Sequence, residues 1–314
     1  MRKVVCSTAA LALLLQLALA TVAMAAGIPG TWSLEASREG GRANFTLRAA
    51  DPGSRSHNVS SHDIDPAELG LRAALSAAAE SKVAFTIVRD AGSFACSGVA
   101  GGGRAAGTFV FTPSEAFLAA MRERGYPELS AHQALQAASL DLTLAFVDGL
   151  IAAGYRGLPF EKLIAFRALG IDGDYARAMQ GAFRGKTISA EDLIPLRALG
   201  VNERFVGEMR DAGLDVPGPK DAVRLRALNV DLAYVRELAA VGYAHLSFEA
   251  VMQLRALGID AAYIKRVQAH GFPHPTIEEL VRLKALNVVR LKALDVVGLK
   301  ALNALRREPP GLAS

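Results

Sequence analysis

The alternation of apolar and polar residues near the start of the chain predicts an antiparallel sheet. Trp32, Leu34 and Ala36 are separated by polar residues, and a period of two recurs around positions 45–47, 83–87, 94–96 and 108–111. Gly40–Gly41 and Ala91–Gly92 are predicted turns. One helix is predicted over Pro66–Ala79, with Asp65 as its N-cap. Residues 27–112 are therefore expected to form a β-rich module of five or six strands and one short helix.

An internal repeat follows, and its period predicts a helical array. The phrase Arg-Ala-Leu-Gly-Ile, or a close variant, recurs at steps of 30, 29, 29 and 29 residues. Its copies begin at Arg167, Arg197, Arg226, Arg255 and Lys284, after a divergent copy near Leu135–Asp141. A second column, half a repeat away, pairs Gly with an apolar residue at Gly125–Tyr126, Gly154–Tyr155, Gly213–Leu214, Gly242–Tyr243 and Gly271–Phe272, with a blurred member near Phe183–Gly185.

Each copy has the signals of one helix that ends and another that begins. A residue able to adopt a positive φ is expected after each first helix, at Gly170, Gly200, Asn229, Gly258 and Asn287. N-caps of the second helices are expected at Asp172, Asn202, Asp231 and Asp260. An aromatic column, expected to pack between hairpins, follows at Tyr175, Phe205, Tyr234 and Tyr263. First helices are expected to begin at Ser189, Ser247 and Thr276.

These signals predict hairpins of helices about 10 to 12 residues long, which are marginal alone and gain stability by stacking. Pro195, deep in a first helix, is expected to kink or shorten it. The predicted fold class is thus α+β and multi-domain: an N-terminal antiparallel β-rich module, then a solenoid-like α-helical hairpin array over 113–288. A repeat-derived tail with a period of eight occupies 289–314.

The first 26 residues are expected to be a secretory signal peptide. Arg2 and Lys3 precede an apolar run over Leu11–Ala20, and Ala23-Met24-Ala25 offers small residues for cleavage after Ala25 or Ala26. The alternative is a retained membrane anchor, because the run is just long enough to span a bilayer. Cleavage is favoured, which predicts a periplasmic or secreted protein without a membrane segment in its mature form.

Composition and charge narrow the function classes. The chain is 51% hydrophobic with a formal net charge of +4, and cleavage would remove Arg2 and Lys3 and leave +2. So small a charge gives little attraction to nucleic acid, which is not expected as a partner. Cys6 would leave with the signal, so Cys96 would be the one thiol and no internal disulfide is expected.

Candidate chemistry is sparse. Cys96 shares the apolar period of Phe94, which favours a buried structural thiol. His57 and His62 flank a Ser-rich stretch and are interpreted as exposed loop residues rather than metal ligands. His270 and His274 are assigned to a stiff inter-repeat loop beside prolines. The sequence contains no HExxH, phosphate-loop or nucleophile-elbow motif and no CxxC pair, so no catalytic residue, metal site or cofactor is expected.

A cationic column repeats with the array, and it has two interpretations. Its members could form a ladder that binds an anionic partner, or each could complement a helix C-terminus, which is the favoured interpretation. The candidate partner-binding residues are this column and the apolar residues that follow Gly in the second column: Arg167, Arg197, Arg226, Arg255, Lys284, Tyr155, Tyr243 and Phe272.

The motif Leu-Arg-Ala-Leu-Gly-Val at Leu196–Val201, with its aromatic and Gly-Tyr followers, resembles the extracytoplasmic repeat regions of some bacterial secreted proteins. It is also similar to repeats attached to membrane zinc peptidases of the β-lactam-sensor type, whose metal motif is absent from this sequence. The strand ending at Gly107–Pro113 is similar to the module that precedes such repeats. The resemblance covers roughly residues 30–288 and implies architecture rather than catalysis.

The leading functional expectation is a non-enzymatic binding scaffold that engages another extracytoplasmic protein through the repeat array. One alternative is a sensory or regulatory module that binds a small ligand or a cell-wall component in the β domain. A second alternative is an enzyme of unrecognised type.

Overall fold

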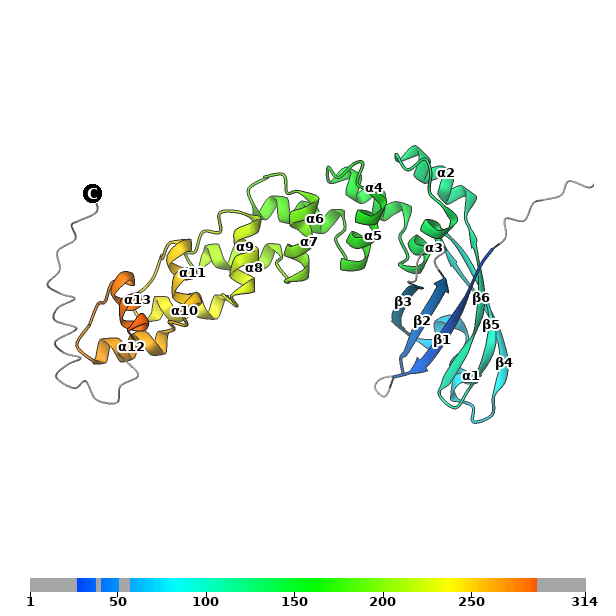
Figure 1. The fold of residues 1–314 in the computed structure, drawn as a ribbon, viewed down its shortest axis with the longest axis horizontal. Helices are drawn as coiled ribbons and strands as arrows, with labels where there is room; N and C mark the ends of the chain where they lie inside the picture. Colours follow the sequence, from blue (N-terminus) through cyan, green and yellow to red (C-terminus); the bar gives the residue numbers. More distant parts are fainter. Residues whose placement is uncertain (1–26, 38–40, 51–56, 287–314) are drawn as a thin grey trace, which may run out of the picture. The chain divides into compact units, whose positions relative to one another are not determined.

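The computed structural model describes residues 27–37, 41–50 and 57–286. By internal contacts the chain divides into two compact units, Met1–Leu144 and Ala145–Ser314. The first holds a sheet and the second a stack of short helices (Figure 1). The α+β architecture, an antiparallel sheet followed by helical hairpins, is therefore confirmed. The predicted signal peptide and the tail over 289–314 lie outside the described residues.

A six-stranded antiparallel sheet forms the first unit, in the order β3-β2-β1-β6-β5-β4. Its strands are β1 (Ile28–Ala36), β2 (Ala43–Ala50), β3 (His57–Ile64), β4 (Ser81–Arg89), β5 (Gly92–Gly101) and β6 (Arg104–Pro113). Two three-stranded meanders are joined by the pairing of β1 with β6, in which Trp32 lies opposite Gly107. The predicted alternation is confirmed at Trp32 and Leu34, which are buried between the exposed Thr31 and Glu35, whereas Ala36 at the end of β1 is exposed.

Two short helices replace the single helix predicted over Pro66–Ala79, so that prediction is wrong in its extent. A 3₁₀ helix, η1 (Pro66–Leu69), is followed by α1 (Arg72–Ser76). Gly70 separates them because it adopts φ 69°, which stops the first turn. Asp65 caps η1 as expected, since its side chain accepts a hydrogen bond from the backbone N–H of Ala67.

β3 is a strand where an exposed loop was expected, so the interpretation of His57 and His62 is also wrong. The segment pairs with β2 along its whole length, which the polar sequence of β3 concealed. His62 is half-buried, and its Nε2 lies 2.7 Å from the backbone oxygen of Ser139 at the end of α3. This histidine therefore ties the edge of the sheet to a helix within the same unit.

Helices α2 (Glu115–Glu123) and α3 (Ala131–Ser139) follow the sheet and belong to the first unit. They already show the repeat's helix-ending turns. Gly125 has φ 97°, and the divergent copy ends with Asp141 at φ 54°. The repeated sequence thus begins on helices that pack with the sheet, since α3 contacts both β5 and β6.

The array in the second unit alternates two kinds of helix. First helices, which end in the Arg-Ala-Leu phrase, are α5 (Phe160–Leu169), α7 (Ala190–Ala198), α9 (Pro219–Ala227), α11 (Phe248–Ala256) and α13 (Ile277–Ala285). Second helices are α4 (Leu144–Ala152), α6 (Gly173–Ala182), α8 (Glu203–Asp211), α10 (Leu232–Ala240) and α12 (Ala261–Ala269). Each has nine or ten residues, slightly fewer than expected. Pro195 lies inside α7, which has nine residues, one fewer than α6 and as many as α8 and α9.

Like helices stack on like helices. Among first helices α5 contacts α7, α7 contacts α9 and α11 contacts α13, while α8 lies between α6 and α10 and α10 contacts α12. The residue directly before each cation of the repeat is buried, as at Phe166 and Leu254. The residue four positions before the cation, such as Leu163 or Val251, is buried too. These two positions lie on one side of each first helix, and their side chains belong to the buried core of the array.

The predicted stop and start signals are confirmed at the described positions. Gly170, Gly200 and Gly258 have φ of 68°, 68° and 63°, and Asn229 substitutes for glycine at φ 54°. After each one, the next backbone N–H reaches back into the helix, as from Ile259 to the Leu254 oxygen at 2.8 Å. The caps expected at Asp172, Asn202, Asp231, Asp260, Ser189, Ser247 and Thr276 all accept a backbone hydrogen bond. Asn287 lies outside the described residues.

Candidate functional site

The solvent side of the first helices presents a recurring apolar surface. Three residues per helix form it: the aliphatic residue three positions before the repeat's cation, and the Ala and Leu that follow the cation. We call this surface the Ala–Leu stripe. Its members are Ile164, Ala168 and Leu169; Ile194, Ala198 and Leu199; Val223, Ala227 and Leu228; Met252, Ala256 and Leu257; and Val281, Ala285 and Leu286.

The stripe is exposed although the helices already bury an apolar side elsewhere. All five alanines are exposed, and Leu199, Leu257 and Leu286 expose 41%, 38% and 57% of their surface. Of the aliphatic residues before the cation, Met252 is buried and the others are half-buried. A single exposed leucine is ordinary. Here an exposed alanine recurs in each of these five helices and an exposed leucine follows it in three of them, while Leu169 and Leu228 are half-buried. The stripe is therefore a recurring apolar feature rather than an isolated side chain.

A groove opens along the stripe between α9 and α11. Its volume is about 620 Å³, and Ala227 and Leu228 of α9 face Met252 and Ala256 of α11 across it. Gln253, Arg224 and Glu249 complete the lining. The lining therefore combines four apolar side chains with three polar ones, a composition that suits an apolar side chain from a partner.

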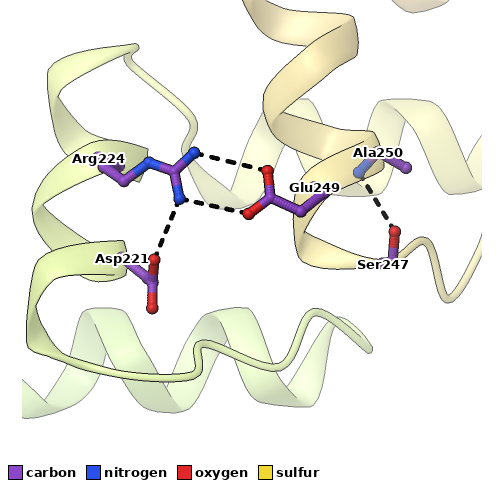
Figure 2. Close-up of polar contacts among 5 residues, drawn as sticks. All are labelled: Asp221, Arg224, Ser247, Glu249 and Ala250. Atoms are coloured by element: carbon purple, nitrogen blue, oxygen red, sulfur yellow. Dashed lines mark hydrogen bonds and ion pairs between the residues drawn. The ribbon is translucent and has the colours of Figure 1, made fainter.

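Arg224 and Glu249, which both line this groove, belong to an ion-pair network that joins α9 to α11 (Figure 2). Arg224 Nη1 lies 3.2 Å from Asp221 Oδ1 in its own helix and 3.3 Å from Glu249 Oε1 on α11, and Nη2 lies 3.5 Å from Glu249 Oε2. Hydrogen bonding to Glu249 raises the pKa of Arg224 above its ordinary value. Its guanidinium carbon also lies 5.1 Å from the centroid of the Phe248 ring. The network therefore links two neighbouring first helices at the groove.

The predicted cationic column is used between repeats. Arg197 Nε donates to the Leu169 oxygen at 3.0 Å, and its guanidinium lies 4.9 Å from the centre of the Tyr175 ring. Arg226, Arg255 and Lys284 repeat both contacts one repeat later each time, and Arg167 lies over Phe146. The cations from Arg197 onward thus complement a helix C-terminus, as the favoured interpretation has it, but that C-terminus belongs to the preceding repeat.

The remaining candidate contact residues point into the array or its loops. Tyr155 is buried and its hydroxyl donates to the Ile188 oxygen at 2.8 Å. Tyr243 is half-buried and donates to the Pro275 oxygen at 2.5 Å. Burial raises the pKa of both phenols. Phe272 is half-buried in the loop after α12. The structure therefore brings none of these three rings into the groove.

Sequence reasoning missed the Ala–Leu stripe, although its residues stand beside the cations in every copy. The sequence does carry a signal for the stripe, because apolar residues recur at helix positions that lie outside the buried side. It went unused because the sequence does not show which side of a short helix a neighbour covers.

The face of the sheet that is turned to the core is filled by aromatic rings. Trp32 is 2% exposed and its ring centroid lies 5.0 Å from that of Phe85, while Phe94 lies 5.3 Å from Phe109. Cys96 is buried beside them, as expected, and burial raises the pKa of its thiol to about 12. This packing makes the interior of the β module a hydrophobic core.

Neither a metal site nor a membrane-spanning helix is found in the described part of the chain. No group of three or more His, Cys, Asp or Glu side chains in that part of the chain is arranged to hold a metal ion. No single helix there combines the length and apolarity needed to cross a membrane, and only the bent pair α3 and α4 passes the test jointly.

No known protein family, curated protein or solved structure matches this chain. The likeness to extracytoplasmic repeat regions therefore rests on the sequence motif alone.

Proposed function

We propose that the protein is a non-enzymatic scaffold that binds another protein through the Ala–Leu stripe of its helical array. The observation that supports this most directly is the recurrence of an exposed alanine in the first helices from α5 to α13, with an exposed leucine beside it at Leu199, Leu257 and Leu286. Folding does not require them, because other positions on the same helices fill the core. A partner that covers them would remove apolar surface from water, at about 25 cal/mol per Å².

The chemistry of the stripe favours a polypeptide partner over a charged or carbohydrate polymer. Its surface is aliphatic, and the neighbouring cations already contact carbonyl groups and rings of the array. An amphipathic helix or an extended segment with large aliphatic side chains fits such a surface, since the groove at Leu228 and Met252 has a volume of about 620 Å³ and an aliphatic part to its lining. The stripe, rather than the cationic column, is therefore the proposed contact surface.

The proposed place of action is the periplasm or the extracellular space. It rests on the signal-peptide pattern in residues 1–26, which lie outside the described residues. A small-ligand site in the β module receives less support, because aromatic side chains fill the core-facing side of the sheet.

Site-specific photo-crosslinking tests the proposal. A photoreactive amino acid at Leu199 or at Leu257 is expected to capture the same partner polypeptide in the exported fraction. The same group at Arg236, exposed on the second helix α10, is the matched control and is expected to capture none. Ala227→Arg, which places a long charged side chain in the groove, is expected to abolish capture. Equal capture from Arg236, or no capture from either leucine, would refute the proposal.

A further inference from the structure

The two edge strands of the six-stranded sheet, β3 and β4, differ in chemistry. β3 is polar, and its Asp63 and His62 are engaged with Arg42 and with the backbone oxygen of Ser139. β4 has six uncharged residues in its middle, Val83–Val88. An edge strand presents backbone N–H and C=O groups that can pair with a further strand, and charged side chains usually protect it. The middle of β4 has no such protection.

The hydrophobic core is incompletely covered at β4. The ring centroid of Phe85 lies 5.0 Å from that of Trp32 and 6.4 Å from that of Phe45, so Phe85 belongs to the core. Phe85 is nevertheless half-buried, whereas Trp32 and Phe45 on the inner strands are buried. Val83 is also half-buried, and Val88 on the opposite face exposes 72% of its surface. A strand added beside β4 would therefore bury apolar surface on both faces of the sheet.

The apolar residues of β4 are complementary to those of a second copy of the strand. When two copies pair antiparallel over the whole of Ser81–Arg89, Phe85 lies opposite Phe85 at a two-fold axis. Val83 then lies opposite Ile87 on the same face. Aromatic pairs and β-branched pairs directly opposite each other are the pairs that stabilise antiparallel strands.

The charges of β4 also permit this register. Lys82 lies opposite Val88, and Arg89 lies opposite Ser81. No two like charges are therefore directly opposed, which would destabilise the pairing.

We propose that β4 pairs with β4 of a second copy across a two-fold axis at Phe85, so that two sheets become one continuous sheet. The paired edge is smaller than the interfaces of about 1,200 Å² or more that hold stable complexes, so the dimer is expected to form reversibly as the concentration rises. This inference does not depend on the proposed function, which concerns the helical array.

Sedimentation velocity of the full chain between about 1 and 100 μM tests the inference, and the parent is expected to shift from monomer towards dimer. Two variants alter the exposed positions Ala84 and Thr86, which would face each other across the axis. One carries Ala84→Lys with Thr86→Lys, and the other carries Ala84→Glu with Thr86→Glu. Each alone is expected to raise the dissociation constant at least about tenfold, because like charges then oppose each other. An equimolar mixture is expected to restore the dimer, because lysine then faces glutamate.

The matched control carries Ala95→Lys with Ser97→Lys on β5. These exposed residues are the cross-strand neighbours of Thr86 and Ala84, one strand further from the edge. The control is expected to dimerise as the parent does.

Three results would overturn the inference. The first is a parent that stays monomeric up to about 100 μM. The second is an equal loss of dimer in the β5 control, which would place the interface on the face of the sheet. The third is a mixture of the two charge variants that forms no dimer. Photo-crosslinking at Leu257 is read separately, so the proposed function stands or falls on its own result.

Discussion

The guanidinium of Arg255 lies 4.6 Å from the ring centroid of Tyr234, in the helix just before its own along the chain. Its Nε also donates to the Leu228 oxygen at 3.0 Å, at the end of the preceding first helix. One side chain thus joins both helices of the neighbouring hairpin. The same double contact at Arg197, Arg226 and Lys284 makes the cation a link between repeats rather than a feature of one repeat.

Arg255→Met is therefore expected to destabilise the array by about 1–2 kcal/mol, since it removes a cation–π contact and a charged hydrogen-bond donor. Urea unfolding followed by circular dichroism measures the change. Arg255→Lys is expected to lose less than half as much stability as Arg255→Met, because Lys284 makes both contacts in the native array.

Arg236→Met is the matched control on the exposed surface of α10, with an expected effect within about 0.5 kcal/mol. Equal losses in the Arg255 and Arg236 variants would show that the inter-repeat contacts add nothing to stability.

Two glycines in α6 are expected to respond in opposite directions to the same substitution. A Cβ on Gly173 would lie 2.2 Å from the Gly149 oxygen, so alanine there would push α6 away from α4. A Cβ on Gly181 would meet nothing within 4 Å. Gly173→Ala is expected to cost about 1–3 kcal/mol, while Gly181→Ala is expected to add about 0.5–1 kcal/mol through lower unfolded-state entropy. Thermal unfolding of the two variants side by side checks this, and the same sign for both would contradict it.

Sequence patterns predicted the array well because its signals are local. A helix end needs a positive φ, and only Gly and Asn offer it cheaply, so Gly200 and Asn229 could be assigned without a structure. N-caps such as Asp260 contact backbone groups within one helical turn, so they too could be predicted from the sequence. Because these signals are local, a sequence period of 29 residues was enough to predict one helical hairpin in each repeat.

Features that depend on a neighbour in space could not be predicted. β3 is polar and forms because β2 pairs with it, and the exposure of Leu257 depends on which side of α11 is covered. The carbonyl that Arg197 contacts belongs to the previous repeat, which the sequence period does not specify. The Ala–Leu stripe was missed for this reason, while the cations beside it were noticed.

Cys96 is expected to be inert towards thiol reagents in the folded protein. Burial raises the pKa of its thiol to about 12, so almost no thiolate forms near pH 8. In the chain without residues 1–26, maleimide labelling at pH 8 is expected to be at least about a hundredfold slower when folded than in urea. Comparable rates in the two states would show that the core around Phe94 opens readily.

The array is expected to lose stability in alkaline solution as its buried tyrosines ionise. Burial raises the pKa of Tyr175 and Tyr234 to about 12, against about 10 for an ordinary phenol. Folding therefore favours the protonated form. The stability that the two protonated phenols contribute is fully present below about pH 10, and it is lost as the pH rises from there towards about 12.

Urea unfolding between pH 8 and pH 11.5 measures this dependence, and the double variant Tyr175→Phe, Tyr234→Phe supplies the comparison. The variant loses two hydrogen bonds, to Val201 and Ile259, so it is expected to be less stable than the parent at pH 8. Its stability is expected to fall less steeply above pH 10, because two of the ionising groups are gone. Both proteins retain Cys96, so its titration cancels in the difference between them. Parallel curves for the two proteins would mean that other groups govern the alkaline transition.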